Sequence, residues 1–71
     1  MKRPGPRGLS QAEIAALTLS ARGMSSHEIA GKLGLCKRTV DFYLDNARTK
    51  LGALTRIHAV ALAVQERIIK P

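Results

Sequence analysis

The segment from Leu35 to Leu51 constrains the fold of this chain more than any other part of the sequence. On an α-helix, which turns by about 100° per residue, its side chains sort onto two opposite faces. One face is apolar and contains Val40, Tyr43, Leu44, Ala47 and Leu51. The other face is mostly polar and contains Arg38, Asp41, Phe42, Asp45 and Thr49. A helix of this kind needs a scaffold beneath its apolar face, while its outer face remains free to contact another molecule.

A shorter helical pattern lies directly before this segment. Ser25 is a good N-cap with Glu28 three residues later, and Gly34 is expected to end the helix in the left-handed conformation. Leu35 is expected to be buried in the connecting turn, and Cys36 to occupy the N-cap of the following helix. Two short helices joined by such a turn are typical of a helix-turn-helix.

Two more helices are predicted, one on each side of this pair. Ser10 followed by Glu13 is a capping box, and Gly23 is expected to end the first helix. Gly52 is expected to stop the third helix, and Thr55 to cap the fourth. The predicted fold is all-α, with four helices at about 10–22, 26–33, 37–51 and 56–67.

The chain is predicted to form one small domain over residues 9–71. Residues 1–8 contain two prolines, two glycines and three cations, so we expect a disordered basic lead-in there. Such a lead-in is either a plain terminal tail or an arm that touches phosphates. With Phe42 and Tyr43 as its only aromatic residues, the chain has a small aliphatic core, which pairing with another subunit would stabilise.

The charge of the chain indicates an anionic partner. Twelve Lys and Arg residues against five acids give a net charge of +7, for which nucleic acid is the first candidate and solubility the alternative. One cysteine cannot form an internal disulfide and suits a reducing compartment. The sequence contains no apolar run long enough to span a membrane, no metal-ligand cluster and no activated catalytic pair. We therefore expect neither an enzyme nor a cofactor, metal or membrane partner.

The pattern as a whole resembles the LuxR-type (GerE-type) helix-turn-helix domain of bacterial transcription regulators. The similarity extends from Leu9 to about Ala63, and the run from Thr39 to Asn46 is most similar to the quorum-sensing branch. The matching positions are Leu9, Ser10, Glu13, Leu17, Ala21, Gly23, Ser25, Glu28, Ile29, Ala30, Leu33, Leu35, Thr39, Val40, Leu44, Lys50, Leu51, Gly52, Arg56, Ala59 and Val60.

This resemblance implies a cytoplasmic, sequence-specific DNA-binding transcription regulator. Its third helix would enter the major groove of double-stranded DNA, and its fourth helix would form a homodimer over an inverted-repeat site. The expected phosphate contacts are Ser25, Lys37, Arg38, Thr39 and Arg48. The expected base-facing residues are Arg38, Asp41, Phe42 and Asp45. The free N–H groups at the start of the third helix would strengthen an anion site beside Lys37 and Arg38.

The outward face of the fourth helix is the candidate dimer surface. It is predicted to contain His58, Ala61, Leu62 and Gln65, with the apolar pair at its centre. Small residues let two helices approach closely across a two-fold axis. The alternative is a surface apolar residue without a partner, which is common.

Three features depart from the family pattern. Cys36 replaces the usual serine cap, and its thiol has either a lowered pKa beside cations or no special role. Tyr43 stands where this branch usually has histidine, and the acids Asp41 and Asp45 lie on the DNA-facing side. In one hypothesis Lys37, Arg38 and Arg48 offset the acids, which then accept a hydrogen bond from cytosine. In the other, the acids abolish DNA binding.

Two alternative functions follow from these features. The chain could be a DNA-non-binding modulator that heterodimerises through its fourth helix with a longer LuxR-type regulator. It could also be a sigma-factor region that docks on promoter DNA and RNA polymerase. The quorum-sensing regulators carry a larger N-terminal ligand-binding domain, so we expect either an excised C-terminal domain or a natural single-domain protein.

Overall fold

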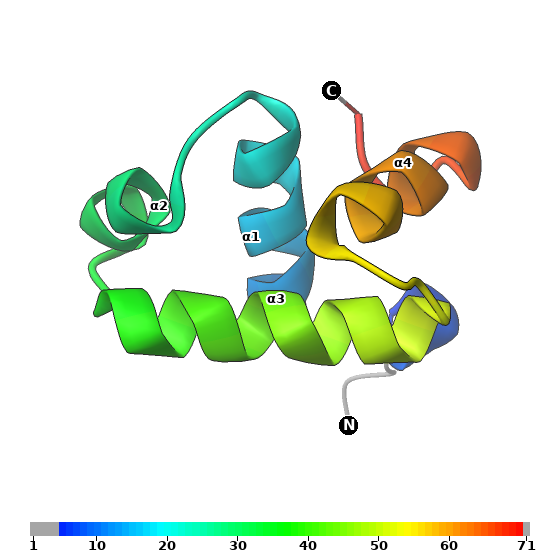
Figure 1. The fold of residues 1–71 in the computed structure, drawn as a ribbon, viewed down its shortest axis with the longest axis horizontal. Helices are drawn as coiled ribbons and strands as arrows, with labels where there is room; N and C mark the ends of the chain where they lie inside the picture. The colour runs from blue at the N-terminus through cyan, green and yellow to red at the C-terminus, as the bar shows by residue number, and fades with distance from the viewer. Residues whose placement is uncertain (1–4, 71) are drawn as a thin grey trace.

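The computed structural model describes residues 5–70 and consists of four α-helices after a short 3-10 turn. In order these are η1 (Pro6–Gly8), α1 (Gln11–Ala21), α2 (Ser26–Leu33), α3 (Lys37–Leu51) and α4 (Arg56–Gln65). The longest helix, α3, runs along one side of the molecule, and the other three helices lie across its inner side (Figure 1). The described residues contain no strand, and the predicted all-α helix-turn-helix fold is confirmed.

The helix ends follow the local signals in the sequence. Ser10 and Ser25 each form a complete capping box, and Gly34 and Gly52 end α2 and α3 with φ near +69°. The second and third helices have the predicted bounds. The predicted end of the fourth helix at about residue 67 is wrong, because Arg67 adopts a positive φ of 60° and α4 stops at Gln65.

The core lies between α3 and the other helices and is aliphatic. The inner face of α3 contributes four buried residues, whereas Tyr43 and Leu35 are only half-buried. Leu35 was expected to be buried, but its position in the turn leaves part of it in solvent. The buried apolar residues are Leu9, Ala16, Leu17, Leu19, Ile29, Ala30, Val40, Leu44, Ala47, Leu51, Ala53, Ala59, Ala63 and Ile69.

One charged residue, Glu13, is buried in the part of the chain that the structure describes. Its Oε1 accepts hydrogen bonds from the Ser10 backbone N–H and from Lys50 Nζ, each at 2.7 Å. Burial by itself raises the pKa of Glu13, but the hydrogen bonds from Lys50 and Ser10 outweigh it and lower that pKa. Lys50 thereby ties the end of α3 to the start of α1.

Residues 5–8, which belong to the predicted lead-in, form a short 3-10 turn and make hydrogen bonds to the rest of the domain. The Gly8 N–H donates to Gly5 O at 2.9 Å, and Lys50 Nζ donates to Gly8 O at 3.0 Å. Arg7 makes two hydrogen bonds to Glu66, at 2.8 and 2.9 Å. Lys50 and Glu66 lie far along the chain from residues 5–8, so the local composition could not indicate these contacts. The rest of the expected lead-in, residues 1–4, lies outside the described residues.

Among residues 5–70 no helix is both long enough and apolar enough to cross a membrane.

Candidate nucleic-acid interface

The outward face of α3 is open to solvent along its length. Arg38, Phe42, Asp45 and Thr49 are exposed, and they follow one another at intervals of three or four residues. This spacing places them on one line along the helix. The Phe42 side chain is among the large apolar groups left in solvent, at 61% exposed. The predicted division of α3 into a buried face and an outer face is therefore observed.

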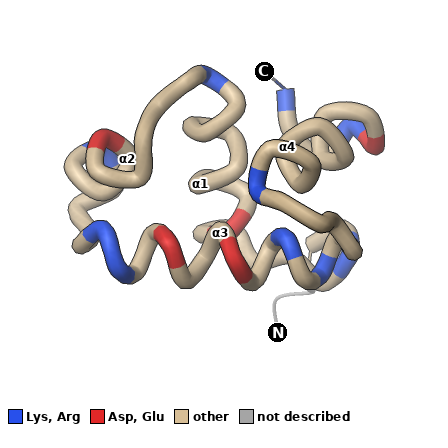
Figure 2. The backbone as a smooth tube through the Cα atoms, viewed as in Figure 1, with Lys and Arg blue, Asp and Glu red and all other residues tan. Residues whose placement is uncertain are grey.

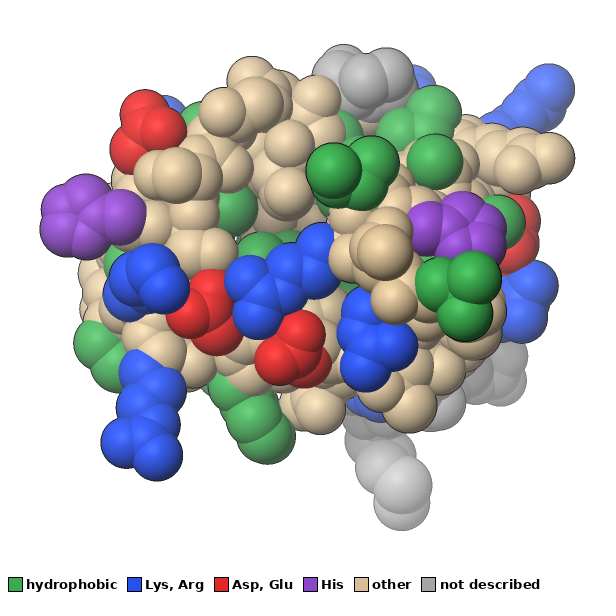
Figure 3. Space-filling view, in the orientation of Figure 1, with side chains coloured by type: hydrophobic (Ala, Val, Ile, Leu, Met, Phe, Trp, Pro, Cys, Tyr) green, Lys and Arg blue, Asp and Glu red, His purple; other side chains and the backbone are tan. Residues whose placement is uncertain are grey.

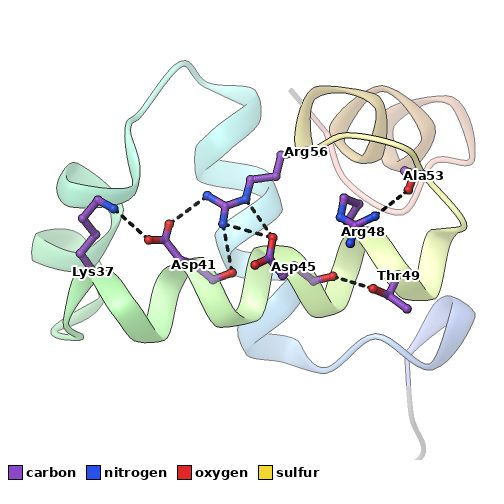
Figure 4. A network of polar contacts seen from close by, with 7 residues as sticks. All are labelled: Lys37, Asp41, Asp45, Arg48, Thr49, Ala53 and Arg56. Carbon is purple, nitrogen blue, oxygen red and sulfur yellow. Dashed lines mark hydrogen bonds and ion pairs between the residues drawn. The ribbon is translucent and has the colours of Figure 1, made fainter.

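The two acids of α3 are held by a residue from another helix. Arg56, the first residue of α4, extends toward both Asp41 and Asp45 (Figure 4). Its Nη1 lies 2.9 Å from Asp41 Oδ1, and its Nη2 lies 3.1 Å from Asp45 Oδ1. Lys37 Nζ lies 2.9 Å from Asp41 Oδ2, one helical turn away. We call these four residues, Lys37, Asp41, Asp45 and Arg56, the acid–base network.

The network corrects the predicted partners of the acids. The pairing of Lys37 with Asp41 is confirmed, but neither Arg38 nor Arg48 forms an ion pair with an acid in the described part of the chain. Arg48 instead donates to the Ala53 carbonyl at 3.1 Å, beyond the end of α3. Arg56 was missed because it lies 15 residues after Asp41 on a different helix. The only signal in the sequence was that Arg56 matches the LuxR-type pattern.

Within the network the charges balance. The Lys37 ammonium is the leading cause that lowers the pKa of Asp41 to about 2, ahead of the Ser26 side chain and the Arg56 guanidinium, so this group is ionised at neutral pH. Two carboxylates thus face two cations, and no net negative charge remains on this part of α3. Along α3 the acidic positions lie between basic ones (Figure 2). In the space-filling view basic and acidic side chains adjoin one another on the same face (Figure 3).

The five candidate phosphate contacts lie at the ends of helices. Ser25 is the exposed N-cap of α2, and its Oγ accepts from the Glu28 N–H at 3.2 Å. Lys37, Arg38 and Thr39 form the first turn of α3. Arg48 lies near the end of α3, about 16 Å along the axis from Lys37 at 1.5 Å per residue. The structure therefore brings three of the five together and places Arg48 at the other end.

Cys36 precedes this first turn as the N-cap of α3. Its thiol makes no hydrogen bond to the helix backbone and instead lies 3.1 Å from the Thr39 hydroxyl. The hydrogen bond with the Thr39 hydroxyl is the leading cause that lowers the pKa of Cys36. A lowered pKa of the Cys36 thiol was one of the two hypotheses, but its leading cause is Thr39 rather than the neighbouring cations.

The candidate dimer surface on α4 differs from the prediction at one position. His58, Ala61 and Gln65 are exposed, whereas Leu62 is half-buried and packs against the core. The exposed aliphatic residues of this region are Leu54 and Ile57, at 85% and 84%. Ile57 precedes Ala61 by four residues and shares its face of α4, a spacing from which the sequence could have identified it. His58 Nδ1 accepts from the Leu54 N–H at 3.2 Å.

Comparison with known proteins decides the family. The sequence model described as "GerE: Bacterial regulatory proteins, luxR family" matches residues 7–63, most of the chain. The chain belongs to the luxR family. This family is one of regulatory proteins rather than an enzyme class.

Individual relatives of this luxR-family domain are regulators from several bacteria. It is 40% identical over 63 residues to the transcriptional activator protein BjaR1 of Bradyrhizobium diazoefficiens, covering 89% of this chain and 26% of BjaR1. It is 39% identical over 70 residues to the transcriptional activator protein EchR of Dickeya chrysanthemi, covering 99% of this chain and 28% of EchR. It is 39% identical over 61 residues to the transcriptional regulatory protein YdfI of Bacillus subtilis, covering 86% and 29%. The chain thus spans about a quarter of the length of these curated relatives.

Proposed function

We propose that this luxR-family domain binds double-stranded DNA through the outer face of α3 and acts as a sequence-specific transcription regulator in the bacterial cytoplasm. The observation that carries the proposal is the exposed line on α3 formed by Arg38, Phe42, Asp45 and Thr49. An α-helix fits the major groove, where each base pair presents its own donors, acceptors and methyl group. The opposite face of α3 is buried, so the helix is held rigidly behind this line.

The proposed phosphate contacts are Ser25, Lys37, Arg38, Thr39 and Arg48. The first N–H groups of α3 have no partner within the helix and attract anions, as do the exposed cations beside them. The net charge of +7 adds a long-range attraction. Contacts of this kind set the register of the helix on DNA without reading sequence.

The proposed base contacts come from the middle of the exposed line. A guanidinium such as that of Arg38 suits guanine O6 and N7, and an apolar ring such as Phe42 suits the thymine methyl. The Phe42 ring is exposed to water, so contact with a thymine methyl group would bury apolar surface and stabilise the complex. The names of the relatives, which describe transcriptional activators and a transcriptional regulatory protein, support this reading.

The proposed assembly is a homodimer on a two-fold DNA site. Its contact would be the exposed face of α4 with His58, Ala61 and Gln65, together with Ile57. One short helix presents a small area, so the dimer would be weak in solution and strengthened on DNA. Because the run from Thr39 to Asn46 is most similar to the quorum-sensing branch, the proposed role of the regulator is in quorum sensing.

A second candidate function is a modulator that pairs through α4 with a longer LuxR-type regulator and does not bind DNA. The exposure of Leu54 and Ile57 favours a protein partner. The acid–base network favours DNA binding instead, because Arg56 and Lys37 remove the negative charge that would repel phosphates. DNA binding is therefore the better supported of the two.

The test is the salt dependence of binding to generic duplex DNA. In the Lys37→Ala, Arg38→Ala double variant the slope of log K against log salt should fall by about 0.9 for each lost phosphate contact. The matched control is Arg22→Ala with Lys70→Ala, which removes two exposed cations outside α3. Equal slopes for both double variants would refute the docking face. A wild-type protein that binds no DNA at low salt would favour the modulator.

A further inference from the structure

Arg56 engages the two acids of α3 unequally. Both carboxylate oxygens of Asp41 are occupied, Oδ1 by Arg56 and Oδ2 by Lys37, each at 2.9 Å. Arg56 reaches only Oδ1 of Asp45, through Nε at 3.2 Å and Nη2 at 3.1 Å. Within residues 5–70, Oδ2 of Asp45 accepts no hydrogen bond. One carboxylate is therefore saturated, and the other keeps a free acceptor.

The free acceptor also has the more open position. The Asp45 side chain is 57% exposed, against 26% for Asp41. Asp45 lies three residues after Phe42 and seven after Arg38, on the exposed line of α3. Asp41 turns toward α4, where Arg56 covers it (Figure 4). Of the two acids, only Asp45 presents an unused oxygen on the face proposed to meet DNA.

We infer that Asp45 is a specificity-determining residue that accepts a hydrogen bond from the N4 amino group of a cytosine, and that Arg56 is the residue that positions it. This inference rests on the proposed function. A carboxylate only accepts hydrogen bonds, and in the major groove the base amino groups that donate them are cytosine N4 and adenine N6. Adenine presents its acceptor N7 beside N6, which repels a carboxylate, so cytosine is the better partner.

Arg56 contributes orientation and charge rather than a contact of its own. All three of its guanidinium nitrogens are directed at Asp41 or Asp45. Contact of Nε and Nη2 with the single oxygen Oδ1 restrains the Asp45 side chain and leaves its second oxygen without a hydrogen bond within residues 5–70. The positive charge offsets the acid, which would otherwise be repelled by the phosphates on either side of the groove.

The experiment is selection of binding sites from randomised duplex DNA by the wild type and by two variants with the same chemical change. Asp45→Asn should lower the preference for cytosine at one position of each half-site by roughly tenfold, and shift it toward adenine, which an amide recognises. Asp41→Asn, one turn earlier, should select the same sequence as the wild type. Arg56→Gln should weaken the base preference at the position that Asp45→Asn changes, whereas Lys32→Gln, which removes an exposed cation outside the acid–base network, should leave that preference unchanged.

The outcomes separate this inference from the proposed function. If the wild type selects a defined sequence and Asp45→Asn selects the same one, the role of Asp45 is refuted while DNA binding stands. If Asp41→Asn alone changes the base preference, the assignment of base recognition to Asp45 rather than Asp41 is also refuted. A wild type that binds no DNA at low salt would overturn the proposed function together with this inference. If Arg56→Gln fails to fold, the exposed Asp45→Asn variant still decides the result.

Discussion

The ion pair between Lys50 and the buried Glu13 is predicted to be a main support of this fold. In Lys50→Met the chain keeps its aliphatic stem but loses the ammonium that lies 2.7 Å from Glu13 Oε1. The Glu13 side chain is only 4% exposed, so water replaces the lost donor poorly. Hydrogen bonds to charged groups contribute about 1.5–3 kcal/mol, and breaking a fully buried pair costs about 3–5 kcal/mol.

Two features of the site place the expected loss of stability in the lower of these two ranges. The Lys50 side chain is 38% exposed, and the Ser10 N–H still donates to the carboxylate. We therefore expect a loss of about 2 kcal/mol in the free energy of unfolding. A domain of this size has roughly 4–10 kcal/mol in total. At about 4–8 °C per kcal/mol, the melting temperature should fall by about 8–16 °C.

The pH dependence of this loss identifies its cause. In the wild type the pKa of Glu13 is lowered, so its contribution to stability is present above the unfolded pKa of about 4.3 and is lost as pH falls through the folded pKa. In Lys50→Met the lowering effect of the ammonium is lost, so the pKa of Glu13 should rise and the ionised carboxylate should contribute less stability at neutral pH. The difference in melting temperature between the two proteins should be largest near about pH 7 and shrink toward about pH 3.

The measurement is thermal unfolding by circular dichroism at both pH values. Lys32→Met is the matched control, because Lys32 is exposed and makes no hydrogen bond or ion pair within residues 5–70. A drop for Lys50→Met no larger than that of the control at neutral pH would refute the reasoning. An equal drop at both pH values would show that the loss does not come from the Glu13 charge.

Three further predictions concern the surface. Ile57→Glu should leave the melting temperature nearly unchanged and abolish cooperative binding to two half-sites. Leu62→Glu should instead unfold the domain, because Leu62 packs on the core, and sedimentation together with circular dichroism distinguishes the two variants. Arg7→Ala breaks an exposed ion pair and should lower the free energy of unfolding by at most about 1 kcal/mol in denaturant titration. The pKa of Asp41 is lowered to about 2, so its stabilising effect is present above the unfolded pKa and is lost as pH falls toward about 2. In Arg56→Gln this pKa should rise when it is followed by NMR, and an unchanged pKa would contradict the pairing of Arg56 with Asp41.

Local signals predicted the fold because each helix carries its own start and stop. The capping boxes at Ser10 and Ser25 and the left-handed glycines Gly34 and Gly52 act within a few residues of the ends they set. The end of α4 was missed because no glycine marks it. There the left-handed residue is Arg67, a type that gives no sign of a positive φ in the sequence.

The partners of the charged residues could not be predicted in the same way. Lys50 lies 37 residues from Glu13, and only the packing of α1 against α3 brings them together. The periodicity of α4 left Leu62 on the outer side, but its apolar surface is broad enough for Leu62 to pack on the core. A helical wheel divides a helix into two faces, whereas α4 contacts both α1 and α3, so residues beside its buried positions, such as Leu62, are half-buried.

The position of Arg56 links the two surfaces that the proposed function requires. Arg56 is the first residue of α4 and binds the acids of α3, and the next residue, Ile57, is exposed on the candidate dimer face. A dimer contact at Ile57 would therefore lie one residue from the group that orients Asp45. Since the guanidinium bridges two side chains one turn apart, the start of α4 cannot shift along α3 without breaking at least one of these bonds. The network thus fixes the proposed DNA-binding face of α3 and the candidate dimer face of α4 relative to each other, which recognition of two half-sites at a set spacing would require.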